Sequence, residues 1–304
     1  MIDILYCFHY PAEDKDALIR FANSLFSIEF QEMCPTLRIN VINTHPNNTI
    51  EDFLYKTVSR WDLRYLHIPY LNPYKFMQFH RAFALNNGIR RLCDNNIIQI
   101  SDIDIVYPYW HFYRMEKLME KHDLLTFTGY RILDADYYYK HSDLLRSSRN
   151  EFVKCHGVPL LKRDVFNYVN GFDEEYIDRG LEDCDFIERV KATKKFGVLE
   201  DVDHEICHLW HKPWNTDTDP NNSNRIRYNE KIPLYKNGTL DPTKVNSLTN
   251  ISSDGLLPCP FCGGEAKEEN QRGQWEGYNI KNIYCQKCAA TASSKEDWNR
   301  RIKL

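Results

Sequence analysis

Apolar residues in the first hundred positions follow two alternating patterns, short continuous runs and runs with helical spacing. Ile2–Phe8, Leu37–Thr44 and Ile97–Ile100 are short apolar runs that predict buried strands. Asp16–Phe30 and Lys75–Cys93 carry apolar residues three and four positions apart, which predicts helices. Strands that alternate with helices indicate a parallel, doubly wound α/β sheet, whose ligands bind beyond the carboxyl ends of the strands.

Further along the chain the same patterns continue with longer interruptions. We expect a helix over Trp110–Lys121, a strand over Leu124–Gly129 and a helix over Leu181–Thr193. Between them, Arg131–Glu151 is polar and rich in tyrosine. Such a loop could cover a bound ligand or simply decorate the surface.

Length and composition indicate two domains. The chain has 304 residues, of which 42% are hydrophobic, enough for one large core and a small satellite. Beyond residue 216, Asn, Asp, Ser, Thr and Pro dominate, with one interruption near Ile226–Tyr235. We therefore expect a main domain over 1–240, a linker over 241–254 and a small domain over 255–304.

Charge and cysteine usage limit the compartment and the partners. A net charge of −4 provides no general positive field for nucleic acid, so such a contact would need a local patch. The first residues include Asp3 and no basic segment, which argues against a signal peptide. No stretch of 18 apolar residues occurs, and the cysteines of the main domain lack a disulfide spacing. We expect a cytoplasmic protein without a membrane segment.

Two Cys-x-x-Cys pairs stand in the small domain, Cys259 with Cys262 and Cys285 with Cys288. Each pair can point two sulfurs inward, and a hairpin between the pairs can bring four thiolates around one Zn²⁺. With four protein ligands the site would be structural, and the metal would supply much of the folding free energy. The alternatives are buried free cysteines or two strained disulfides.

Asp102 and Asp104 directly follow the predicted strand Ile97–Ile100. In an extended segment, side chains two positions apart share a face, so the two carboxylates could together hold a divalent cation. Asp is also common in turns after strands, and this is the simpler explanation of an isolated Asp-x-Asp.

Two more polar clusters follow. Glu182, Asp183 and Asp185 open a predicted helix, where acids also complement the helix dipole by up to about 1 kcal/mol. His208 and His211 are three positions apart and could ligate a metal if they shared a helical turn. On its own, such a pair is more often structural.

Taken in order, these segments resemble the motif series of A-type (GT-A) glycosyltransferases, nearest the β-1,4-galactosyltransferase and chondroitin-polymerase group. The resemblance covers about residues 1–235. It rests on FHRAFALNNG at 79–88, ISDIDIVYP at 100–108, VNGFD at 169–173, GLEDCDF at 180–186 and HLWH at 208–211. It implies a metal-dependent, inverting transfer of a sugar from a nucleoside diphosphate to an acceptor hydroxyl.

For the donor, the resemblance implies a site with a divalent cation. Asp104, with Asp102 beside it, would hold the metal that stabilises charge on the leaving diphosphate. His211, with His208, matches the family's distal metal ligands. A set of carboxylates and imidazoles suits Mn²⁺, with Mg²⁺ as the alternative. The family's usual donor is a uridine diphosphate (UDP) sugar.

The same motif positions imply catalytic roles. Asp183 matches the general base that takes the proton of the acceptor hydroxyl, and Glu182 matches its acceptor-orienting partner. Asp185 would support the turn, and Arg81 matches a residue that reaches donor groups.

The chain departs from the family pattern at two positions. Arg179 lies in the region where the family usually has a Trp that stacks on the acceptor sugar, and Cys184 replaces a common acid. The first departure favours an acceptor other than the usual amino sugar. Neither change affects Asp183.

The small domain resembles the zinc ribbons of Lar-type restriction alleviation proteins, which are common in bacteriophages. Leu256–Gly264 and Glu296–Arg301 carry this similarity over about 50 residues. The combination suggests a phage enzyme acting in the cytoplasm of an infected bacterium, with a hydroxymethylated pyrimidine of phage DNA as acceptor. Basic and aromatic residues of the ribbon could contact the DNA, although acids dilute them. Reaching the base could require flipping it from the stack.

Two other interpretations stay open. The enzyme could glycosylate a polysaccharide, a lipid-linked glycan or a protein, with the ribbon as a docking module. Alternatively, the chain could be a nucleic-acid or protein adaptor built on an inactive transferase fold, against which the intact motif residues argue.

Overall fold

The computed structural model describes residues 1–10, 15–45, 49–68, 80–131, 151–176, 180–209, 222–245, 266–272, 279–285 and 291–292. The chain divides into two compact units, one comprising residues 1–70 and 79–245 and the other residues 71–78 and 246–304. Each unit has its own sheet.

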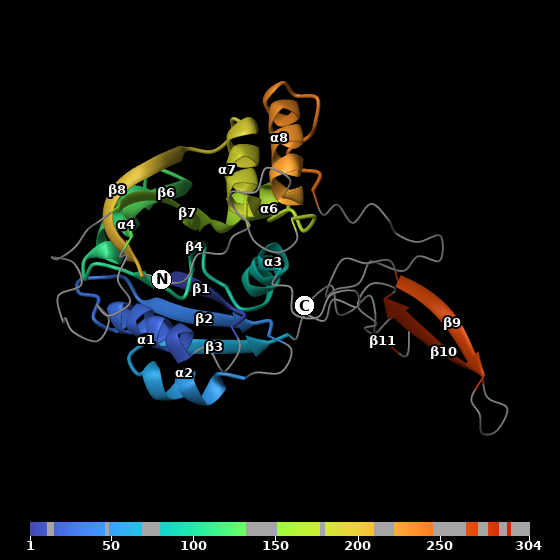
Figure 1. Ribbon diagram of the computed structural model, residues 1–304, viewed down its shortest axis with the longest axis horizontal. Helices are drawn as coiled ribbons and strands as arrows, with labels where there is room; N and C mark the ends of the chain where they lie inside the picture. Colours follow the sequence, from blue (N-terminus) through green and yellow to red (C-terminus); the bar gives the residue numbers. More distant parts are fainter. Residues whose placement is uncertain are drawn as a thin grey trace. The chain divides into compact units, whose positions relative to one another are not determined.

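Half of the sheet in the first unit is parallel (Figure 1). Its strands are β1 (Ile2–Phe8), β2 (Leu37–Asn43), β3 (Asp62–His67) and β4 (Ile97–Ser101), in the order β3-β2-β1-β4. Every residue of β1 is buried, as expected for a strand covered on both faces. The three strands predicted in this half are confirmed. The sequence did not reveal β3, because its residues are all partly or fully exposed.

The other half is mixed, which corrects the prediction of a wholly parallel sheet. Strand β7 (Glu151–Lys162) is antiparallel to β4 and to β6 (Leu124–Arg131). Strand β8 (Val198–His208) is parallel to β6, and β5 (Ile105–Val106) is antiparallel to β8. The strand and helix alternation behind the prediction is clear only in the first part of the chain. Without it, nothing in the local pattern specifies strand direction.

The mixed half curls back toward β4. Strand β5 lies four places from β4 in the sheet, although only three residues separate the two strands along the chain. In a flat sheet this distance would be about 19 Å, whereas the connection can span at most about 14 Å. The sheet must therefore bend, as Figure 1 shows for β6 and β8. The curl brings the end of β8 beside the turn after β4.

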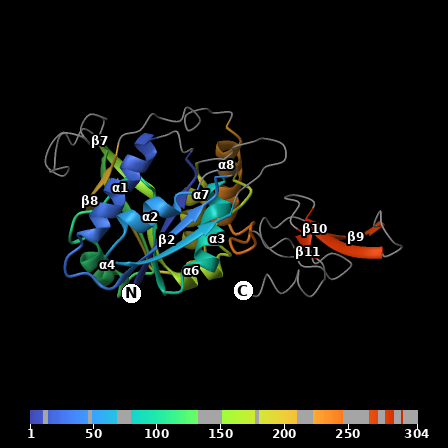
Figure 2. The same cartoon turned by 90° about the horizontal axis from the view of Figure 1, so that it is seen from below.

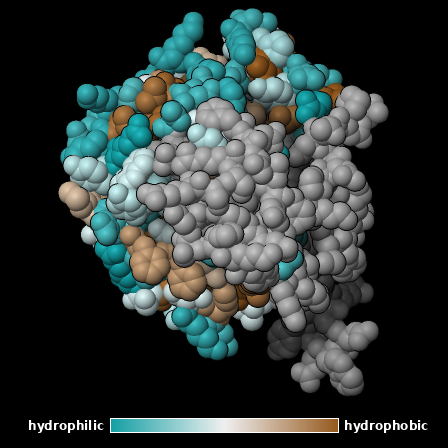
Figure 3. Space-filling model, turned by 60° about the vertical axis from the view of Figure 1, so that its left-hand side comes forward, coloured by the Kyte–Doolittle hydropathy of each residue, from teal (hydrophilic) through white to brown (hydrophobic). Residues whose placement is uncertain are grey.

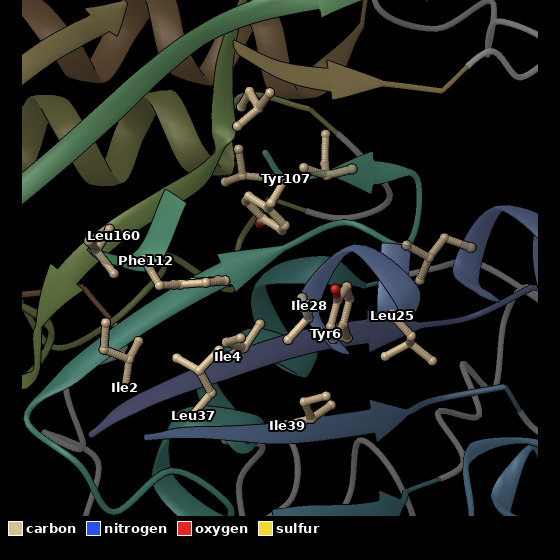
Figure 4. Close-up of a cluster of buried hydrophobic side chains, with 14 of the residues drawn as sticks. Ile2, Ile4, Tyr6, Leu25, Ile28, Leu37, Ile39, Tyr107, Phe112 and Leu160 are labelled. Atoms are coloured by element: carbon tan, nitrogen blue, oxygen red, sulfur yellow. The ribbon is translucent and has the colours of Figure 1, made fainter. Parts of the chain in front are cut away.

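Helices cover both faces of the sheet, as expected for a doubly wound fold. On one face, α1 (Lys15–Glu29), α2 (Glu51–Thr57) and α4 (His111–Met119) pack on alternate strand residues. Figure 4 shows part of this layer, in which Leu25 of α1 and Tyr6 of β1 belong to one buried cluster.

The opposite face carries the helices that bear the candidate catalytic residues. Helices α3 (Arg81–Arg91), α6 (Arg163–Tyr168) and α7 (Glu182–Ala192) pack on the intervening strand residues, such as Leu5 of β1. Helix α8 (Ser223–Lys236) lies beside α7 in Figure 1 and, turned by 90°, in Figure 2.

The predicted helices form with small shifts at their ends. Helices α1, α4 and α7 begin and end within two residues of the predicted bounds. Helix α3 begins at Arg81, where His80 caps it by accepting a hydrogen bond from the Phe83 N–H at 3.3 Å. Residues 75–79 of the predicted helix lie outside the described residues. The strand predicted over Leu124–Gly129 is confirmed as β6. Most of the tyrosine-rich stretch, residues 132–150, lies outside the described residues.

The second unit contains a small antiparallel sheet in the order β11-β10-β9. Strand β9 (Ala266–Arg272) pairs with β10 (Asn279–Cys285), which also pairs with β11 (Thr291–Ala292). The side chains of the four cysteines proposed as zinc ligands lie outside the described structure. The zinc ribbon therefore stays a prediction.

The surface of the first unit is mostly hydrophilic on the face drawn in Figure 3, with apolar side chains in small groups. Among the described residues, Phe30 and Met33 are the most exposed large apolar side chains, at 72% and 79%. Scattered exposure of this kind is normal and indicates no partner by itself. In the described part of the chain, no helix has the length and apolar character needed to cross a bilayer.

Candidate active site

Arg81 links two acidic motifs that lie far apart in the sequence. It opens α3, whereas Asp102 follows β4 and Glu182 opens α7. Its Nη2 donates to Asp102 Oδ1 at 3.0 Å, and its Nη1 donates to Glu182 Oε1 at 3.0 Å. The guanidinium thus connects the Asp-x-Asp turn to the first turn of α7.

Arg81 is buried yet stays charged, because acids surround it. Only 8% of its side chain is exposed. Burial alone would lower the pKa of Arg81, but the charges of Asp102, Glu182 and Asp183 together hold that pKa well above its ordinary value. A further hydrogen bond runs from Arg81 to the carbonyl of Gly157 on β7. Lysine lacks the rigid fork of donors that makes these contacts together.

Gly157 leaves room at the centre of the cluster. A Cβ atom on Gly157 would lie 3.2 Å from Asp102 Oδ2 and 3.5 Å from both Arg81 Nη2 and Asp183 Oδ2. Three charged side chains therefore converge where β7 carries no side chain. Gly157 was not predicted as a site residue, because a single glycine near an apolar run has no distinctive signal in the sequence.

Glu182 has an unusual protonation equilibrium. Burial, followed by the charge of Asp183, raises the pKa of Glu182 to about 7, while Arg81 acts in the opposite direction. Its Oε2 atom is buried and has no hydrogen-bond partner among the residues that the structure describes. A carboxyl group in this state can accept or donate a hydrogen bond near neutral pH, which suits a substrate-orienting role.

Asp183 anchors one carboxylate oxygen and directs the other into the cluster. Its Oδ1 accepts a hydrogen bond from the Cys184 N–H at 2.7 Å. Its Oδ2 would lie 3.5 Å from a Cβ atom on Gly157. Unlike Glu182, Asp183 is only partly buried. The arrangement leaves one carboxylate oxygen for a proton.

Asp185, predicted to support the turn, lies on α7 and belongs to a buried network of hydrogen bonds. Its Oδ2 pairs with Arg189 Nε at 2.6 Å, and its Oδ1 accepts from the Tyr176 hydroxyl at 3.2 Å. Arg189 also donates to the carbonyls of Val169 and Gly171. Arg179 lies outside the described residues.

Asp102 and Asp104 lie in a turn, which corrects the extended segment assumed for their shared face. The Ile105 N–H donates to the Asp102 carbonyl at 3.3 Å and closes the turn. The two carboxylates consequently have different neighbours. Asp102 faces Arg81, whereas Asp104, only 3% exposed, has its Oδ1 3.7 Å from His208 Nε2.

Asp104 and His208 form a pair that suits a divalent cation. His208 ends strand β8 rather than lying in a helical turn, and the Leu209 N–H donates to the Asp104 carbonyl at 2.7 Å. A carboxylate oxygen and an imidazole nitrogen at this separation can share one metal ion. Within the described ranges no third His, Cys, Asp or Glu completes such a site. His211, the expected further ligand, lies outside them.

Polar side chains also gather at the carboxyl ends of the parallel strands, where α/β sheets bind ligands. After β1 and β2, His9 Nδ1 lies 2.9 Å from Thr44 Oγ1. At the end of β3, His67 Nε2 lies 2.7 Å from the His45 carbonyl. These residues were not predicted as site residues, because each is ordinary in the segment after a strand.

The comparisons with known proteins agree with this fold. The family model described as the N-terminal domain of galactosyltransferase matches residues 145–211. This segment contains Gly157, Glu182, Asp183 and His208. No curated protein sequence matches the chain.

Solved structures of TarS from S. aureus are similar to this chain. For TarS 1–349, the TM-score is 0.50 at 10% identity, covering 68% of this chain and 60% of that chain. For the same fragment in complex with UDP-GlcNAc, the TM-score is 0.52 at 9% identity, covering 83% and 76%. The chain thus spans about 60% of the length of the first of these structures. At such low identity the likeness shows the shared α/β fold alone.

The fold is thus shared with these structures, and the segment that carries the acidic motif of α7 matches the galactosyltransferase domain model.

Proposed function

We propose that this protein transfers a sugar, with inversion and in a metal-dependent reaction, from a nucleoside diphosphate to an acceptor hydroxyl. The observation that carries the proposal is the convergence of Asp102, Arg81 and Asp183 on Gly157. An in-line displacement needs donor-binding groups and a base within the reach of one sugar. The spacing of these three side chains supports that requirement.

The proposed donor is a UDP sugar. TarS, whose fold this chain shares, has been solved with UDP and with UDP-GlcNAc, which supports this choice. Asp104 and His208, with His211, would hold Mn²⁺ or Mg²⁺ close to the diphosphate. When bound, the cation would neutralise charge on the leaving diphosphate. The nucleoside would contact the polar residues after β1 and β2, including His9 and Thr44.

In the proposed reaction, Asp183 Oδ2 accepts the proton of the acceptor hydroxyl while that oxygen attacks the anomeric carbon. The bond between the anomeric carbon and the diphosphate breaks on the opposite face. Glu182 orients the acceptor through its second oxygen. Arg81, fixed by Glu182 and Asp102, supplies a positive charge that needs no rearrangement during the reaction.

Donor turnover by the purified protein with Mn²⁺ and a panel of nucleotide sugars tests this proposal. Asp183→Asn should lower turnover by roughly 10²–10⁴-fold, because a general base contributes about that much. Binding of the nucleotide, followed by calorimetry, should be unchanged, and removal of the cation with EDTA should stop turnover. Wild-type turnover by Asp183→Asn would exclude Asp183 as the base.

For the acceptor, we propose a hydroxymethylated pyrimidine of phage DNA, modified in the cytoplasm of the infected bacterium. The resemblance of residues 255–304 to Lar-type ribbons supports this choice. The test is incubation with DNA containing 5-hydroxymethylpyrimidines, followed by mass spectrometry of the digested nucleosides. A sugar-sized mass gain that is absent with Asp183→Asn is expected. Donor hydrolysis without any gain would reject DNA and direct the search to glycan, lipid-linked or protein acceptors.

A further inference from the structure

Beside the proposed base, three residues form a chain of contacts that the reaction above does not use. Cys184 Sγ lies 3.6 Å from His156 Nδ1, and His156 Nε2 lies 3.6 Å from Asp201 Oδ1. Cys184 directly follows Asp183 on α7, and His156 directly precedes Gly157 on β7. The contacts therefore run from β8 across β7 to the helix turn that bears the base.

An irregularity in β8 aims Asp201 at His156. The register between β6 and β8 shifts between Leu125 and Phe127, and Asp201 at this bulge has a φ of 55°. A left-handed conformation is unfavourable for most L-residues, and bulges beside active sites commonly redirect a side chain. Thr126 Oγ1 fixes the bulge by accepting from the Asp201 N–H at 3.0 Å.

The first turn of α7 lacks an ordinary cap. Leu181 precedes the helix with a left-handed φ of 72° and makes no side-chain capping bond. Glycine or asparagine is usual in that conformation, and serine, threonine or aspartate usually caps a helix. The direction of the Asp183 side chain therefore depends on contacts within and around this turn.

Cys184 is suited to hydrogen bonding and poorly suited to nucleophilic attack. Burial, followed by the charge of Asp183, raises the pKa of Cys184 far above its ordinary value, so the thiol keeps its proton. Nearby titratable groups come from three elements: Glu182 and Glu188 on α7, Tyr228 on α8 and Lys154 on β7, which pairs with Asp201.

We propose that Asp201, His156 and Cys184 form a positioning relay that fixes the direction of the Asp183 carboxylate. The proposal rests on the proposed role of Asp183 as the base. Asp201 orients the imidazole of His156, the imidazole holds the thiol of Cys184, and the thiol and amide of Cys184 hold Asp183. None of the three touches the substrate.

Steady-state kinetics of donor turnover test the relay. His156→Ala and Cys184→Ala should each lower kcat on the order of 10-fold with donor KM unchanged, because a misdirected base slows only the chemical step. Cys184→Ser should recover most of the rate, since its hydroxyl keeps a hydrogen-bonding group. Cys34→Ala, which removes a partly buried thiol of another region, is the matched control and should match the wild type.

The double variant His156→Ala/Cys184→Ala should be no slower than the slower single variant, because both substitutions interrupt one chain. Three outcomes would each overturn the relay. The first is a double variant whose loss of kcat is the product of the two single losses, the second is a single variant with wild-type kcat, and the third is a raised KM with unchanged kcat. Circular dichroism of every variant checks that a loss of rate is not a loss of fold, and Cys184→Ser decides the question if an alanine variant unfolds.

A second measurement does not depend on activity. Alkylation of Cys184 by iodoacetamide, followed by mass spectrometry of the Cys184 peptide, should be slow in the wild type and several-fold faster in Asp183→Asn. Removing the neighbouring carboxylate charge favours the thiolate. Equal rates would overturn the contact between thiol and base. If the wild type turns over no donor, the proposed function fails, and the alkylation rates still decide this contact.

Discussion

Glu182 and Asp183 are adjacent in the sequence but differ in burial. Glu182 is 3% exposed and paired with Arg81, whereas Asp183 is only partly buried. Neighbouring carboxyl groups in different surroundings can take different roles at one pH. Their surroundings therefore suit Glu182 to orienting a substrate and Asp183 to acting as a base, although both are acids in one helix turn.

Glu182→Gln should change how stability depends on pH. The pKa of Glu182 is raised from 4.5 to about 7, so the folded state binds the extra proton in this window. The stability contributed by the protonated form is lost as the pH rises through about 7. Urea unfolding measures the free energy of unfolding of both proteins between about pH 5 and about pH 8. As the pH rises through this range, the wild type should lose stability and Glu182→Gln should not, so the variant gains stability relative to the wild type. A difference that does not vary with pH would contradict the raised pKa.

Lys194→Gly should stabilise the protein. Lys194 follows the end of α7 with a φ of 54°, at the position where helices usually carry glycine. Glycine removes the strain of the left-handed conformation but adds conformational entropy to the unfolded chain. The net increase in the free energy of unfolding should be about 0.5 kcal/mol. Thermal unfolding measures it. Lys195→Gly, which removes the contact with Tyr168, should destabilise and serves as the comparison. Equal effects of the two substitutions would refute the explanation.

At the scale of elements, a buried ion pair within α7 anchors this helix to a neighbouring turn. Arg189 and Asp185 are both fully buried, and Arg189 also donates to carbonyls in the turn at residues 169–171. Helix α7 carries Glu182 and Asp183 on its first turn. The pair therefore helps to hold Glu182 and Asp183 in place relative to the turn at residues 169–171. It takes no part in the chemistry itself.

Arg189→Leu should destabilise the fold by about 3–5 kcal/mol, because it leaves Asp185 as an uncompensated buried charge. Asp185→Leu/Arg189→Leu should lose less, since neither charge then remains. Urea unfolding compares the two variants. Lys191→Ala, which breaks partly exposed pairs with Glu188 and Glu200, should cost no more than about 1 kcal/mol. A double variant less stable than the single one would contradict the argument.

At the scale of the whole molecule, the first unit continues to Val245. Val245 is buried, and its carbonyl accepts a hydrogen bond from Asn170. The carbonyl of Pro242 accepts from Arg189. These contacts fall within the segment predicted as the linker over 241–254, so a functional truncation must keep them.

A chain ending at Val245 should fold and retain donor turnover, because its own sheet and core are complete. A chain ending at residue 240 should melt at a lower temperature, since it loses the two contacts to Asn170 and Arg189. Thermal unfolding and donor hydrolysis measure both. Loss of DNA transfer alone after truncation at Val245 would assign recognition to the second unit, and loss of folding would contradict the division.

Local patterns were sufficient for the elements with clear hydrophobic periodicity. Strand β1 is a continuous apolar run, and α1 and α7 have apolar residues on one face, so their bounds followed within two residues. The acidic motifs at Asp102 and Glu182 were visible because their order and spacing resemble a known family. Partly exposed β3 and the polar beginning of β7 have no such pattern and were missed.

Only the tertiary structure decided how these pieces combine. The curl of the sheet brings His208 to Asp104, Arg81 joins acids that are 80 positions apart along the chain, and Gly157 leaves the space where they converge. Each contact depends on strand order and direction, which residues distant in sequence determine together. Hydrophobic periodicity specifies which face of a strand or helix is buried, but not which distant element covers it.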